Sequence, residues 1–398
     1  MVTINSFAAS SSAPQDTKKT KPLDVVFVQD TTGSQGPYIT SARKAIRGIC
    51  DRIAASAELS QDQIRFGLIA FRDHPPQDTS YVTKEFGFTS DIAVMQKNLA
   101  SLIASGGGDG PEAQTAAIAA ALNLKWAEDA IKMVILITDS PPHGLGEYGD
   151  GFDKSPDQND PLQIARQMAE RGITLFVIAC EPALSMYKHA VDFYSALAQI
   201  TSGRIFPLTM ADKLGDYIVG TAIETIETEN LIGEFEKVIV DEVFAKDAPV
   251  ESVVDNLQEF MKSRGVQINS VTVEGGYAET ETFKKKVNIW HNSKTVGAAR
   301  TEVKSLAPEV AEDDDDNDDD DGEMGFSLGE DSEYTWDRER ETGAIKKRSH
   351  VPRGRGGLFG VVGWRMSKIL KAQEQMPSML MVDPASKIYL YLEAEAPF

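Results

Sequence analysis

The chain has 398 residues, of which 41% are hydrophobic, and a formal net charge of −21 at pH 7. This length allows one large domain or two to three smaller ones. No apolar run approaches the roughly 20 residues that a membrane-spanning helix needs. Such an acidic chain is a poor general binder of nucleic acid, so we expect cations or proteins as its partners.

Two features of the sequence predict a cytoplasmic protein, with a nuclear location also open. Residues 1–22 contain no apolar core of a secretory signal, and we expect them to form a flexible arm. The chain has only Cys50 and Cys180, which are too few for a framework of disulfides and fit a reducing compartment.

The first 220 residues alternate between predicted strands and predicted helices. We expect strands at 24–29, 64–71, 83–89, 132–138, 173–179 and 205–208. We expect helices at 37–56, 91–104, 111–126, 161–171, 187–200 and from 211 to about 244. This order predicts an α/β fold with a doubly wound, mostly parallel sheet and helices on both faces. The segment 72–82 is too short for a crossover helix, so strand 83–89 should be an antiparallel edge strand.

The segment Asp30-Thr31-Thr32-Gly33-Ser34 follows the first strand directly. In open α/β sheets, ligands bind in the crevice outside the carboxyl ends of the strands. The hard oxygen atoms of Asp30, Thr32 and Ser34 suit a small divalent cation, Mg²⁺ before Zn²⁺. The same residue types also cap helices, so an ordinary helix N-cap is the alternative interpretation.

Chain direction places two more carboxylates at this edge of the sheet. Asp139 ends the strand 132–138, and Asp109 lies in the glycine loop that follows the helix 91–104. We therefore expect Asp109 and Asp139 to converge with Asp30. The alternative for Asp109 is that it caps the helix beginning at Pro111. Glu112 is expected in the first turn of that helix, where it would complement the helix dipole.

These motifs resemble those of the von Willebrand factor A (vWA) domain over residues 23–225. The segment Tyr194–Phe206 also resembles the part of that family that precedes the last strand. The resemblance implies a metal-ion-dependent adhesion site (MIDAS) in which the Thr32 and Ser34 hydroxyls bind Mg²⁺ directly. It implies that Asp30 and Asp139 act through water or hydrogen bonds, and that a carboxylate of a partner protein completes the coordination.

One position departs from the family pattern, because Asp109 stands where the family usually has a threonine. The additional carboxylate should strengthen cation binding and weaken the attraction for an acidic partner residue. It could also favour Ca²⁺ or Mn²⁺ over Mg²⁺.

The segment Arg72-Asp73-His74-Pro75-Pro76 and the loop 140–160 resemble those of intracellular vWA proteins. That group includes vWA-bearing alpha-kinases and fungal relatives, but residues 226–398 contain no glycine-rich ATP loop and no Cys/His zinc signature. We expect Arg72, Asp73, His74 and His143 to contact a partner at the rim of the site. The leading interpretation is thus a non-enzymatic module that binds proteins through a divalent cation.

Two other functions stay open. A metal-assisted hydrolase or phosphatase could use Asp30, Asp139, His74 and His143. Alternatively, the chain could be a scaffold with a vestigial metal site, whose partners dock on the charged segments of its C-terminal part.

The C-terminal part is expected to contain three regions. Residues 226–311 should form a helical and mixed extension, with strands at 271–273 and 286–290. Residues 312–323 carry ten carboxylates and no base, which predicts a disordered acidic linker. Residues 324–398 form a basic C-terminal segment that we expect to be partly ordered, with a short helix at 366–372 and a strand at 388–392.

Overall fold

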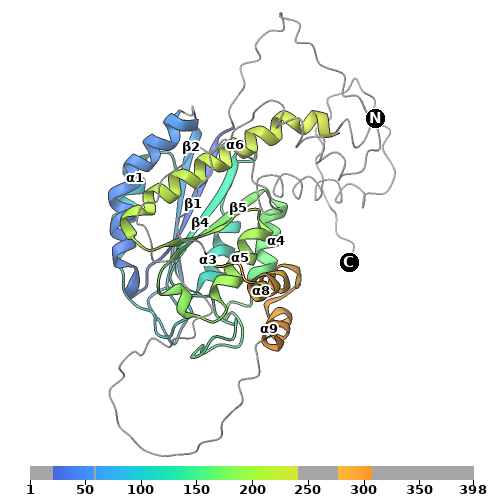
Figure 1. The fold of residues 1–398 in the computed structure, drawn as a ribbon. Helices are drawn as coiled ribbons and strands as arrows, with labels where there is room; N and C mark the ends of the chain where they lie inside the picture. The colour runs from blue at the N-terminus through green and yellow to red at the C-terminus, as the bar shows by residue number, and fades with distance from the viewer. Residues whose placement is uncertain (1–20, 58–59, 241–276, 307–398) are drawn as a thin grey trace, which may run out of the picture.

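The computed structural model of the chain describes residues 21–57, 60–240 and 277–306 (Figure 1). Most of the N-terminal arm lies outside the described residues, as do the predicted strand at 271–273, the acidic linker and the basic C-terminal segment. Within the described ranges, no helix combines the length and the apolar character needed to cross a membrane.

A six-stranded sheet forms the centre of the fold, in the order β3-β2-β1-β4-β5-β6 (Figure 1). The strands are β1 (Leu23–Asp30), β2 (Ile64–Phe71), β3 (Thr83–Thr89), β4 (Ile131–Thr138), β5 (Ile173–Cys180) and β6 (Ile205–Leu208). All neighbours pair in parallel except β2 and β3, which are antiparallel. This confirms the predicted doubly wound sheet with one antiparallel edge strand. The inner strands are apolar along their length because helices cover both of their faces.

Two layers of helices cover the sheet (Figure 1). One face packs against α1 (Gly36–Ala57), α2 (Ile92–Ala100) and α6 (Leu214–Val240). The other face packs against α3 (Gln114–Leu122), α4 (Pro161–Glu170) and α5 (Ala190–Ile200). On this side, α8 (Glu281–Asn292) packs on the outside of α5, and α9 (Val296–Ser305) packs on α8. The core of the domain therefore consists of two apolar layers, one on each face of the sheet.

Residues 277–306 are helical, which corrects the prediction of a strand at 286–290. Phe283, Val287 and Trp290 recur at helical spacing on one face of α8, and all three are buried against the domain. The side chains of Thr280 and Thr295 cap α8 and α9 by accepting hydrogen bonds from backbone N–H groups. Together these features favour a helix over the period-2 alternation on which the strand prediction rested.

The glycine loop is also longer than predicted. Helix α2 ends at Ala100, and α3 begins at Gln114 instead of Pro111. Glu112 therefore lies before the helix, where its backbone N–H donates to Pro141 O at 3.0 Å. The prediction that Glu112 sits in the first helical turn is wrong, because a tertiary bridge to the segment after β4 holds it in extended conformation.

Backbone hydrogen bonds join the loops at the carboxyl ends of the strands. Gly33 N donates to Gly106 O at 3.2 Å, and Ser105 N donates to Thr31 O at 3.0 Å. Ala113 N donates to Arg72 O at 2.9 Å. The loop after β1, the loop after β2 and the glycine loop thus form one connected surface.

Candidate metal centre

Three hydrogen bonds hold the Asp30 side chain at this edge of the sheet. It is fully buried at the end of β1. Its Oδ1 accepts hydrogen bonds from Thr32 N at 2.9 Å and from Thr32 Oγ1 at 2.7 Å. Its Oδ2 accepts from Thr138 Oγ1, on β4, at 2.8 Å. Because the Thr32 hydroxyl donates its proton to Asp30, its oxygen keeps lone pairs for a cation.

Asp139 is the second carboxylate of this group and directly follows β4. It is largely buried, at 9% exposure. Burial and, to a smaller extent, the negative charge of Asp139 raise the pKa of Asp30 to about 7, against the hydrogen bonds from Thr32 and Thr138. Two carboxylates that disfavour each other's charge in a buried setting are stabilised by a cation.

Ser34 lies in the short turn Gly33–Gln35 that precedes α1, and its side chain is exposed. The turn is held against the glycine loop through the Gly33–Gly106 hydrogen bond. Asp30 thus ends β1, Thr32 is the N-cap residue of the turn, and Ser34 lies within it.

Glu112 is a member of this group that the sequence analysis missed. Its side chain is 5% exposed, and its Oε2 has no hydrogen-bond partner among the described protein groups. Burial raises the pKa of Glu112 to about 10, with further contributions from Asp30, Asp73, Asp109 and Asp139. Glu112 thus lies near enough to these four carboxylates for the charge of each to act on it.

Gly107 is the backbone position against which Glu112 rests. A Cβ atom at Gly107 would lie 2.7 Å from Glu112 Oε1 and 3.4 Å from Thr32 Cβ. Glu112 and Thr32 therefore pack on the same glycine. An extended Gly-Pro-Glu segment after a glycine loop was the only signal in the sequence that could have placed Glu112 here.

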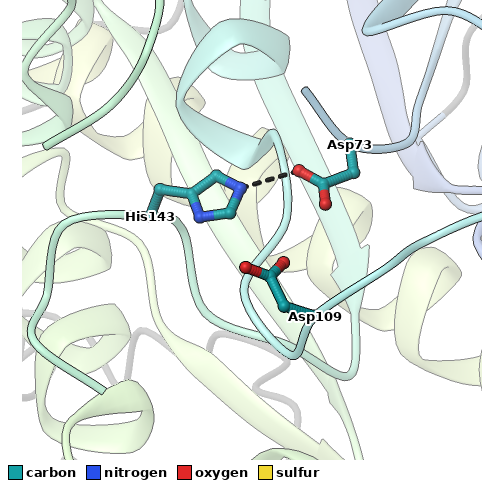
Figure 2. Close-up of side chains that lie close together, drawn as sticks. All are labelled: Asp73, Asp109 and His143. Atoms are coloured by element: carbon teal, nitrogen blue, oxygen red, sulfur yellow. Dashed lines mark hydrogen bonds and ion pairs between the residues drawn. The ribbon is translucent and has the colours of Figure 1, made fainter. Parts of the chain in front are cut away.

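Asp109 belongs to a second group, together with Asp73 and His143 (Figure 2). One ligand atom from each of the three side chains lies within 4.8 Å of the other two. Asp109 Oδ2 also accepts hydrogen bonds from Gly151 N at 3.1 Å and Gln77 Nε2 at 3.4 Å. The predicted interpretation of Asp109 as a helix cap is wrong, because the N-cap of α3 is Ala113.

The four predicted partner-contact residues are all buried, at no more than 8% exposure. Arg72 donates to Ser80 Oγ at 2.7 Å and to Ile103 O at 2.8 Å, and its guanidinium lies over the Tyr81 ring. The rings of His74 and His143 lie 5.9 Å apart, and Phe152 packs edge-on against both. In this arrangement these side chains hold the loops together.

Residues 24–216 match the family model of the von Willebrand factor type A domain. An ariadne-like RING finger protein of Acanthamoeba polyphaga mimivirus is 26% identical over 246 residues, which are 58% of this chain and 23% of the relative. The alpha-protein kinase vwkA of Dictyostelium discoideum is 30% identical over 134 residues, which are 34% of this chain and 21% of the kinase. The chain thus spans less than a quarter of the length of these curated relatives.

Solved structures with a similar fold cover about half of this chain. Proximal thread matrix protein 1 from the mussel byssus is 16% identical with a TM-score of 0.36, over 50% of this chain and 45% of that one. BatB from Bacteroides thetaiotaomicron is 17% identical with a TM-score of 0.35, over 51% of this chain and 98% of that one.

Proposed function

Because residues 24–216 form a von Willebrand factor type A domain, we propose that this chain is a non-enzymatic module that binds a protein partner through a divalent cation. Domains of this type generally serve as interaction modules. The cation site would lie at the carboxyl ends of β1 and β4, where Asp30, Thr32, Ser34 and Asp139 gather. We place the module in the cytoplasm, because its two cysteines are buried free thiols.

The main support for the proposal is the burial of the Asp30 carboxylate together with the charges around it. The Asp30 carboxylate is fully buried and lies near the negative charge of Asp139. Its hydrogen-bond partners are hydroxyl and amide donors, so it has no positive partner among the described residues. A divalent cation at this position would offset the desolvation and the repulsion together.

The residues present fit a hard cation. The Thr32 and Ser34 hydroxyls would bind it directly, and Asp30 and Asp139 would hold its water ligands. We propose that Glu112, whose Oε2 lacks a hydrogen-bond partner, supplies the oxygen of the glycine loop in place of Asp109. An all-oxygen site that keeps several waters suits Mg²⁺, and Mn²⁺ or Ca²⁺ could take the same ligands. The remaining coordination position would accept an oxygen of the partner, such as a carboxylate.

Titration calorimetry of the full chain with Mg²⁺, Mn²⁺ and Ca²⁺ tests the cation site. We expect Asp30→Asn to remove one binding event that the wild type shows, because the substitution deletes the charge and keeps the shape. Asp129→Asn is the matched control, since Asp129 is exposed before the start of β4, at the opposite edge of the sheet. Equal cation binding by wild type and Asp30→Asn would refute the site. Both variants keep the acidic segment 312–323, so cation binding by that segment contributes equally to the titrations that are compared.

A pull-down with and without EDTA tests the partner. The proposal expects a bound protein that EDTA releases and that Asp30→Asn fails to retain, while Asp129→Asn retains it. A partner that binds equally well in EDTA would favour the scaffold with a vestigial metal site instead.

A further inference from the structure

Three side chains from three different loops converge beside the Asp30 group (Figure 2). Asp73 follows β2, Asp109 lies in the glycine loop, and His143 follows β4. We propose that Asp73, Asp109 and His143 form a second metal site, which binds a transition-metal cation of the Zn²⁺ class. The bound cation would link the three loops to one another. This site does not depend on a cation at Asp30.

Asp150 fixes the orientation of the His143 ring through its Nδ1 atom. Its Nδ1 lies 2.8 Å from Asp150 Oδ1, and Asp150 Oδ2 accepts a hydrogen bond from Gly144 N at 2.7 Å. Phe152 N donates to Asp150 Oδ1 at 3.0 Å, so Asp150 is itself held in place. A carboxylate behind one ring nitrogen is the arrangement that orients a histidine toward a metal through its other nitrogen. Here that other nitrogen, Nε2, faces Asp73, and Asp109 lies beside the pair (Figure 2).

An unsatisfied buried oxygen gives independent support. Asp73 is fully buried, and its Oδ1 lies 2.7 Å from His143 Nε2 and 2.6 Å from the donor His74 N. Its Oδ2 has no hydrogen-bond partner among the described protein groups, and neither does Asp109 Oδ1. Figure 2 shows the Asp109 carboxylate directed toward His143 and Asp73. Two ionised carboxylates only accept hydrogen bonds, so the unpartnered oxygens of Asp73 and Asp109 need a proton or a cation as their partner.

The donor set distinguishes this site from the one at Asp30. An imidazole nitrogen with two carboxylates suits Zn²⁺, which binds histidine and carboxylate at about 2.0–2.2 Å, whereas Mg²⁺ prefers oxygen ligands alone. The 2.7 Å contact between His143 Nε2 and Asp73 Oδ1 is a hydrogen bond. Entry of the metal would release the Nε2 proton to solvent and replace this hydrogen bond with two metal–ligand bonds. Three protein ligands leave the fourth position to water.

Zn²⁺ binding to the metal-stripped full chain, measured against a competing chelator in excess Mg²⁺, tests the proposal. We expect the wild type to bind one more equivalent of Zn²⁺ than His143→Gln does. His291→Gln, on α8, is the matched control and should bind as the wild type does. Asp109→Asn should also lose the equivalent, and Asp150→Asn should weaken it by about 10-fold to 100-fold because the histidine loses its orienting partner.

Co²⁺ provides a spectroscopic check of the ligands. We expect visible absorption bands of Co²⁺ bound by nitrogen and oxygen in the wild type and in Asp30→Asn, and their loss in His143→Gln and Asp109→Asn. Equal Zn²⁺ binding and equal spectra in wild type and His143→Gln would overturn the proposal. Near-ultraviolet circular dichroism of the metal-free variants shows whether each is folded. If His143→Gln does not fold, Asp109→Asn replaces it as the test variant, because Asp109 is only half-buried.

The variants separate this proposal from the proposed function. Loss of Zn²⁺ in His143→Gln together with unchanged Mg²⁺ binding in Asp30→Asn would support the second site and refute the first. The opposite pair of results would refute the second site and support the first. If the three residues form only a hydrogen-bonded junction, His143→Gln would lower the melting temperature without changing Zn²⁺ binding, which also refutes the metal site.

Discussion

Asp30 is the residue whose surroundings most favour a nearby positive charge. Burial alone disfavours its ionised form, and the hydrogen bonds from Thr32 and Thr138 offset only part of that cost, because the pKa of Asp30 stays raised at about 7. Glu112 adds a third buried acid, whose pKa is raised further. Acids in this state keep a proton unless a cation replaces it, so proton and cation compete for the same oxygens.

Gly107 allows Glu112 to approach Thr32, and Gly107→Ala tests this role. Gly107 has a φ of +84°. An alanine there is strained by about 1–3 kcal/mol, and its Cβ would displace the Glu112 carboxylate. We therefore expect lower stability together with Mg²⁺ affinity weakened about 10-fold or more, as calorimetry would measure.

Gly149→Ala is the control for Gly107→Ala. Gly149 has a φ of +80°, but a Cβ there would meet nothing within 4 Å. This variant should lose similar stability from backbone strain and keep the Mg²⁺ affinity of the wild type. Equal Mg²⁺ affinities in the two variants would show that Glu112 does not take part in cation binding.

At the scale of elements, α8 completes the core although it lies outside the residues that match the family model. Trp290 is fully buried, packs edge-on against Phe193 with ring centroids 5.5 Å apart, and donates from Nε1 to Asp192 Oδ1 at 3.1 Å. Lys286 Nζ lies 3.9 Å from Asp192 Oδ2. The interface between α5 and α8 therefore contains a buried charged group within an apolar layer.

Asp192 makes the stability of this interface depend on pH. Burial and, to a smaller extent, Glu147 raise the pKa of Asp192 from 3.8 to about 7, against the opposing effects of Lys286 and Trp290. Between about pH 4 and 7 the folded chain therefore holds a proton that the unfolded chain has released. Stability should fall with rising pH in this range, by up to about 1.4 kcal/mol per pH unit from this group.

Urea unfolding of wild type and Asp192→Asn at several pH values checks this expectation. Asp192→Asn removes the titrating carboxyl group, so the difference in pH slope between wild type and variant carries the test. We expect the stability of the wild type to fall relative to the variant from about pH 4 to 7. Asp129→Asn should run parallel to the wild type, and parallel curves for Asp192→Asn would contradict the assignment.

The sequence predicts the strands well because each is a short apolar run bounded by polar or turn residues. The bounds of β2, β3 and β6 agree with the prediction. Elements whose ends depend on tertiary contacts were predicted less well. The start of α3 is moved by the bridge between Glu112 and Pro142, and α8 was mistaken for a strand.

The same distinction applies to the candidate metal centre. Chain direction alone places Asp30, Thr32 and Asp139 at one edge, because strand ends are fixed by the sheet. The grouping of Asp73, Asp109 and His143 depends on the conformations of three loops, which periodicity and spacing do not report. The three residues were each named from the sequence, but their association was not.

The distribution of charge over the whole molecule favours cations at this face. Ten of the acidic residues lie in 312–323, and without them the net charge of −21 becomes −11. The described domain adds the inward-facing acids Asp30, Asp73, Asp109, Glu112 and Asp139 at one edge of the sheet. The field of such a chain raises the local concentration of cations and disfavours acidic partners at a distance. A partner carboxylate could bind only at short range, on the cation itself.

The stability of the whole domain should therefore depend on Mg²⁺. A ligand that binds only the folded state at 100 times its Kd adds about 2.7 kcal/mol to the free energy of unfolding. For a domain of this size, that corresponds to a rise in Tm of roughly 5–10 °C. Differential scanning calorimetry of the full chain at increasing Mg²⁺ should show this rise in the wild type and in Asp129→Asn. It should be absent in Asp30→Asn, whose folded state has lost the buried charge that the cation offsets. A Tm that rises equally in all three chains would locate the stabilising ion elsewhere, and the proposed role of Asp30 would then be wrong.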